Sequence, residues 1–117
     1  ILVTDAMAGA AAPPGRYRLG ELELERGKEP VARDPVTSRP AGAAVSLDQC
    51  VRNVMRWFGV SLHEAVVWAG TQPLRFLKNS GTTASSSEAY QFVWWEEQES
   101  GWQVKATRSG QFLFNGV

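Results

Sequence analysis

The apolar positions along the chain change from strand-like at the start to helical in the middle. ILVTD at residues 1–5 is a β-branched apolar run, which predicts a buried strand of the kind found in parallel sheets. Over 17–32, tyrosine and leucine alternate with charged residues and the parity shifts at Gly20, which predicts two or three short strands. The small-residue segment 6–16, closed by a Pro-Gly turn, and the segment 33–42 are predicted to be loops.

Apolar residues recur at helical spacing through the central part of the chain. The motif SLDQ at 46–49 has the form of a capping box and predicts a helix that ends at Gly59. The motif SLHE at 61–64 predicts a second helix, which ends at Gly70. Pro73 suits the first turn of a third short helix. We therefore expect consecutive helices joined by tight turns.

The last part of the chain returns to strand character. Serine-rich, polar residues predict a loop or linker over 79–88, and the aromatic run that follows predicts a strand over 90–95. Two further segments, 102–108 and 111–115, are predicted to pair as a hairpin. The two adjacent tryptophans of the aromatic run must point to opposite faces of their strand.

Composition limits the chemistry that the chain can perform by itself. The 117 residues carry 12 Lys and Arg against 12 Asp and Glu, so the charge gives no general footprint for nucleic acid or an anionic membrane. No apolar run reaches the roughly 18 residues of a membrane span, and we expect a cytoplasmic location. Cys50 is the single cysteine and is expected to be a buried hydrophobe, while His63, the single histidine, is expected to face solvent.

Asp5 is the leading candidate for a chemical role. It ends the predicted first strand, and active sites of α/β folds lie beyond the carboxyl ends of their strands. A carboxylate there can act as a general base or as a metal ligand. From the residues alone, an Asp that caps a turn with its own backbone is the more common alternative. A helix-turn-helix over 46–78 is a weaker hypothesis, because its few basic residues are balanced by acidic ones.

Two long segments carry a family resemblance. Residues 1–25, with the motif VTDA, and residues 40–77, with VRN at 51–53 and GVSLHEA at 59–65, closely resemble the C-terminal third of N-acetylglucosamine-6-phosphate deacetylase, of the amidohydrolase superfamily. The chain departs from the family at Ala43, where a serine is usual.

The resemblance implies an α/β fold, the C-terminal piece of a (β/α)₈ barrel with strands of a small β-sandwich domain. Residues 1–78 would hold the last barrel strand, the sugar-site loop and the closing helices, and residues 79–117 the linker and the sandwich strands. It implies amide hydrolysis of N-acetylglucosamine 6-phosphate to glucosamine 6-phosphate and acetate, with Asp5 as the catalytic residue. The loop that borders the sugar would be Pro40, Ala41 and Gly42.

The resemblance also implies partners that this chain does not supply. A divalent metal ion, zinc by expectation, would be held mainly by residues absent from the sequence, and the full-length enzyme would be a homodimer without nucleic-acid or membrane partners. One Asp cannot hold and activate a metal ion, so the isolated chain is expected to be inactive and to fold only in part. The alternative hypothesis is a non-catalytic helical docking or dimerisation module derived from that enzyme.

Overall fold

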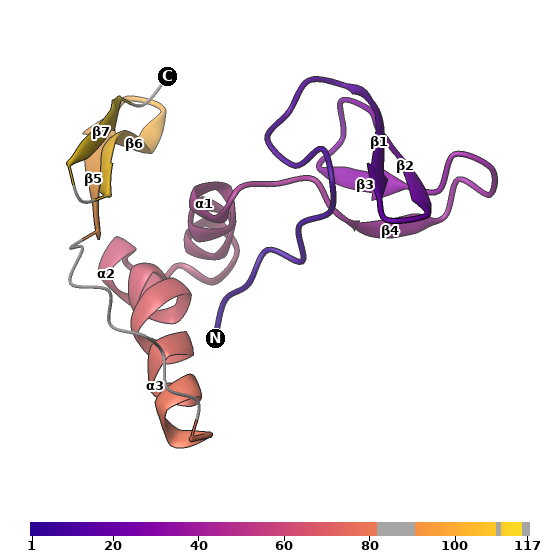
Figure 1. Cartoon of the computed structure of the whole chain (residues 1–117). Coiled ribbons are helices and arrows are strands. Elements are labelled where there is room, and N and C mark those ends of the chain that lie inside the picture. Colours follow the sequence, from indigo (N-terminus) through magenta and orange to yellow (C-terminus); the bar gives the residue numbers. More distant parts are fainter. Residues whose placement is uncertain (82–90, 110, 116–117) are drawn as a thin grey trace.

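The chain forms two small antiparallel sheets with a run of helices between them (Figure 1). A computed structural model describes residues 1–81, 91–109 and 111–115. Over these residues the fold contains both helices and strands, and no (β/α)₈ barrel is present among them. Every helix in this part of the chain is too short or too polar to span a lipid bilayer.

The first sheet is a four-stranded meander. Its strands follow the chain order as β1 (Gly15–Leu19), β2 (Leu22–Arg26), β3 (Val31–Arg33) and β4 (Pro40–Ala43). Gly20, with φ of 62°, supplies the left-handed backbone that the tight β1–β2 turn requires. The prediction of short strands over 17–32 is confirmed. The prediction of a loop over 33–42 is wrong at its end, because β4, which begins at Pro40, pairs with β3 as an edge strand.

The predicted strand at residues 1–5 does not form. Ile1 and Val3 are 66% and 69% exposed, and among the described residues the segment meets the sheet at one isolated parallel bridge, between Ala6 and Ala43. A parallel strand needs a continuous ladder of hydrogen bonds to a neighbour, and a single bridge does not provide one. The segment still lies against the helices, since the Leu2 N–H donates to the carbonyl oxygen of Trp68 at 2.8 Å.

The helices follow the two predicted start signals closely. Helix α1 spans Leu47–Phe58 and ends where Gly59 adopts φ of 67°. The second capping box is formed in α2 (Leu62–Val66): the Glu64 N–H donates to Ser61 Oγ at 3.2 Å, and the Ser61 N–H donates to Glu64 Oε2 at 2.9 Å. The first box is incomplete, because the Ser46 side chain accepts no backbone N–H of α1.

The predicted helix end at Gly70 is wrong. A π-helical turn, Val67–Thr71, carries the chain without a break from α2 into α3 (Gln72–Asn79). Pro73 lies in the first turn of α3, as predicted. The short π segment satisfies the backbone hydrogen bonds that a helix end at the glycine would have left open, so propensity alone did not decide the boundary.

The second sheet contains β5 (Gln91–Gln98), β6 (Gly101–Ser109) and β7 (Phe112–Asn115). The predicted hairpin is confirmed as β6–β7. Of the linker predicted over 79–88, Asn79 still belongs to α3, residues 80–81 form a turn, and residues 82–88 lie outside the described residues. Trp95 packs against the core that α1 and α2 form, while Trp94 is 67% exposed. Because adjacent strand residues point to opposite faces, the two tryptophans divide as expected. The central core consists of Val51, Val54 and Ala65.

Candidate active site

The structure brings the two predicted parts of the site together through backbone hydrogen bonds. The Ala43 N–H donates to the carbonyl oxygen of Asp5 at 2.9 Å, and the Met7 N–H donates to the carbonyl oxygen of Ala43 at 2.9 Å. These two bonds are the pattern of a single parallel bridge between Ala6 and Ala43. Asp5 therefore lies beside β4, the strand that contains Pro40, Ala41 and Gly42.

Asp5 has an unusual backbone for a residue other than glycine. Its φ is 51°, in the left-handed region that Asp tolerates better than most side chains. The adjoining Ala6 N–H donates to Thr4 Oγ1 at 3.2 Å, and the Asp5 side chain is exposed. Backbone conformations of this kind cost about 1–3 kcal/mol and persist only where the surroundings hold them, often at functional sites.

The described residues do not form a metal centre by themselves. No group of three or more His, Cys, Asp or Glu side chains that could hold a metal ion occurs among residues 1–81, 91–109 and 111–115. A catalytic zinc site uses three protein ligands, with a further position open for water. Asp5 can therefore contribute at most one carboxylate, and the remaining ligands of any metal ion would come from other residues.

The other sequence candidates lie apart from this site. His63 is exposed in the first turn of α2, as predicted. Cys50 is buried in α1, where burial raises the pKa of its thiol, so it is a packed side chain and a poor nucleophile. Of the basic residues, Arg52 forms a 2.6 Å ion pair with Asp48 within α1, and the Arg56 guanidinium lies 5.9 Å from the ring centre of Trp57.

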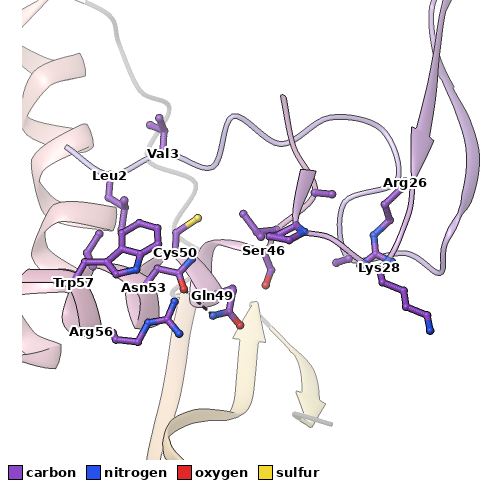
Figure 2. Close-up of a pocket in the computed structure, with 15 residues that line it drawn as sticks. Leu2, Val3, Arg26, Lys28, Ser46, Gln49, Cys50, Asn53, Arg56 and Trp57 are labelled. Atoms are coloured by element: carbon purple, nitrogen blue, oxygen red, sulfur yellow. Dashed lines mark hydrogen bonds between the residues drawn. The ribbon is translucent and has the colours of Figure 1, made fainter. Parts of the chain in front are cut away.

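An open groove of about 690 Å³ lies between the first sheet and α1 (Figure 2). Arg26 and Lys28 stand on one side, and Arg56 and Trp57 stand on the other. Asp5 does not line this groove, and neither do the residues of the predicted sugar loop. Sequence reasoning missed the groove because its lining comes from separate segments whose meeting no local pattern encodes.

The chain is similar in sequence to proteins named as deacetylases. It is 36% identical over 87 residues to the putative N-acetylgalactosamine-6-phosphate deacetylase of Escherichia coli (strain K12), which covers 73% of this chain and 50% of the relative. It is also 36% identical over 87 residues to the N-acetylgalactosamine-6-phosphate deacetylase of Escherichia coli O157:H7, covering 73% of this chain and 22% of the relative. The N-acetylglucosamine-6-phosphate deacetylase of Vibrio furnissii is 32% identical over 76 residues, covering 65% of this chain and 18% of the relative.

No protein-family model and no solved structure matches the chain. The matched relatives are all named as deacetylases, which are hydrolytic enzymes. The chain is thus related to the amino-sugar-6-phosphate deacetylases and matches a portion of those proteins, which confirms the family resemblance. It spans half the length of the first of these relatives and about a fifth of the others.

Proposed function

We propose that this chain contributes the proton-transferring carboxylate and a sugar-binding loop to a deacetylase of N-acetylated amino-sugar 6-phosphates. The observation that carries the proposal is the bridge from Asp5 to β4, because it joins both predicted parts of the site in one backbone unit. The names of the relatives support this substrate class and include both the galactosamine and the glucosamine sugars.

The proposed role of Asp5 follows from the chemistry of amide hydrolysis. The carboxylate accepts a proton from the attacking water while the water oxygen forms a bond to the acetyl carbon. It then passes that proton to the sugar nitrogen as the carbon–nitrogen bond breaks, which yields acetate and the free amine. An exposed carboxylate on a backbone held by β4 is suited to such a shuttle, since its proton partners must reach it.

The rest of the proposed enzyme lies outside this chain. We expect a divalent metal ion, zinc by the family resemblance, to be held mainly by residues other than those described. Other residues would also complete the barrel that the resemblance implies, while residues 79–117 would contribute strands to the small sandwich domain. The full-length enzyme would be a cytoplasmic homodimer without nucleic-acid or membrane partners. We propose that the isolated 117-residue chain is inactive because the residues that the structure describes form no metal centre.

A chimeric enzyme tests the proposal. The segment of the Escherichia coli O157:H7 relative that matches this chain is replaced by residues of this chain, and acetate release from both N-acetylated amino-sugar 6-phosphates is measured. We expect an active chimera that loses about 10²–10⁴-fold in kcat on Asp5→Asn, the range for loss of a general acid or base. Asp34→Asn, at a partly exposed position in the connection between β3 and β4, is the matched control and should retain activity.

Two results would count against the proposal. A chimera that folds but has no activity would favour the alternative, a helical docking or dimerisation module. That alternative is supported by Trp57 and Phe58, which are 63% and 68% exposed at the end of α1. An active chimera in which Asp5→Asn has no effect would remove the assigned role of this carboxylate.

A further inference from the structure

We propose that Gly42 is a positioning residue for Asp5, acting through Met7 and the backbone bridge to β4. The effect of Gly42 on the backbone bridge is argued from the geometry alone, whereas its effect on catalysis rests on the proposed function of Asp5. It assigns to Gly42 a task that differs from bordering the sugar, because the residue acts on the neighbouring chain segment.

The space beside Gly42 is already filled. A Cβ atom added at Gly42 would overlap Cγ of Met7, and it would lie 3.1 Å from the carbonyl oxygen of Asp5 and 3.2 Å from Met7 Sδ. The backbone oxygen also accepts the hydrogen bond from the Ala43 N–H, so a shift of a few tenths of an ångström away from a Cβ would strain that bond. Any side chain at position 42 would therefore push on both residues that flank Ala6.

The conformation of Gly42 adds a second requirement. Its φ is 111°, a region that residues with a Cβ rarely adopt. Gly101, the first residue of β6, provides a natural comparison, since its φ is 102° but, its chain neighbours aside, no atom of the described residues lies within 4 Å of the position of its Cβ. The two glycines share the backbone strain of a substitution, and only Gly42 adds the steric contact.

The bridge connects this contact to the geometry of Asp5. Asp5 keeps φ of 51° beside β4, to which two backbone bonds join this segment, one from the Ala43 N–H to the Asp5 carbonyl and one from the Met7 N–H to the Ala43 carbonyl. A Cβ at position 42 would force the Met7 side chain to a new position and push the Asp5 carbonyl oxygen by a few tenths of an ångström, and both shifts act on the residues whose backbone groups form the bridge to Ala43. Asp5 would then relax to a negative φ, and its carboxylate would point in a different direction.

Amide hydrogen exchange in the 117-residue chain tests the structural part. We expect the N–H groups of Met7 and Ala43 to be protected, and Gly42→Ala to abolish that protection while the amides of α1 stay protected. Gly101→Ala should keep the protection at both bridge amides. The double variant Gly42→Ala with Met7→Ala, which removes the overlapping Cγ and Sδ, should restore part of it.

These outcomes decide the inference in each case. Unchanged protection in Gly42→Ala would overturn it, and so would a double variant that recovers nothing. If Gly42→Ala fails to fold, folding of both the double variant and Gly101→Ala would support the steric contact, whereas failure of the double variant would overturn it.

The active chimera tests the catalytic part. We expect Gly42→Ala to lower kcat about a hundredfold with KM nearly unchanged, as for a misplaced catalytic group, and Met7→Ala to rescue part of the loss. A rise in KM with unchanged kcat would overturn the inference, because it would assign Gly42 to direct sugar contact. An inactive parent chimera would refute the proposed function and leave the exchange results to decide the positioning role.

Discussion

The two sheets of the molecule differ in how deeply they bury particular apolar side chains. In the β1–β4 sheet, whose strands are short and rich in charge, Leu24 and Ala32 are completely buried. In the aromatic β5–β7 sheet, Phe92, Trp94 and Leu113 are 61%, 67% and 65% exposed. The register places these three on one face, because Arg108 pairs with both Phe92 and Leu113.

The difference comes from what covers each sheet. Tyr17 pairs directly with Leu24, so both occupy the same face of the first sheet. The loop over 6–14 folds onto that face, with Gly9 against the Tyr17 ring and the Tyr17 hydroxyl donating to the carbonyl oxygen of Pro13 at 2.5 Å. The second sheet has its helical contact through Trp95 on the other side. Whether a loop or helix packs over a face of each sheet therefore decides the burial of its apolar side chains more than the number of apolar residues does.

The largest expected effect separates the two sheets directly. Leu24→Ala should lower the free energy of unfolding by about 2–5 kcal/mol, because it leaves a cavity under a closed surface. The matched change Leu113→Ala, at a 65% exposed position, should stay within about 0.5 kcal/mol. Urea unfolding followed by far-ultraviolet circular dichroism measures both. Equal shifts for the two leucines would mean that the second sheet is covered as well as the first.

A smaller effect should separate the two faces of β5. Trp95→Ala should lower the free energy of unfolding by about 1–3 kcal/mol, because its ring packs on Val51, Val54 and Ala65. Trp94→Ala should change it by about 0.5 kcal/mol or less, since this ring is 67% exposed. The same urea experiment provides the measurement. If Trp94→Ala lowered the free energy of unfolding more than Trp95→Ala, then the face of β5 that carries Trp94, and not the face that carries Trp95, would pack on the helices.

The smallest effect concerns the helices between the sheets, where local hydrogen bonds act instead of burial. The Ser61 backbone N–H and hydroxyl donate to Glu64 and hold the pKa of its carboxyl below the ordinary 4.5. A lowered folded pKa stabilises the fold above the unfolded pKa, and this stabilisation is lost as the pH falls through the folded pKa.

Unfolding measured from neutral pH downward through the titration of this carboxyl checks the linkage. Glu64→Gln should reduce the decrease in the free energy of unfolding that accompanies falling pH. Ser61→Ala should reduce this decrease less, because the backbone N–H donor of residue 61 remains. Acid curves that match the parent chain in both variants would show that the capping box contributes no linkage.

Local signals predicted much of the fold. The capping box at Ser61, the helix end at Gly59 and the β1–β2 turn at Gly20 appear where short-range hydrogen bonds and left-handed glycines require them. The strand at residues 1–5 and the helix end at Gly70 were wrong, because the first depends on neighbours from elsewhere and the second on continuous backbone bonding through a π turn.

For the candidate site, the sequence by itself named Asp5 and the Pro40–Gly42 loop through their resemblance to a family, because residue types and their spacing can be compared along the sequence alone. The tertiary structure alone decided that the two meet, that Met7 fills the space beside Gly42 and that Asp5 takes a left-handed backbone. Those facts depend on hydrogen bonds and contacts between segments more than 30 residues apart, and no local preference encodes such a pairing.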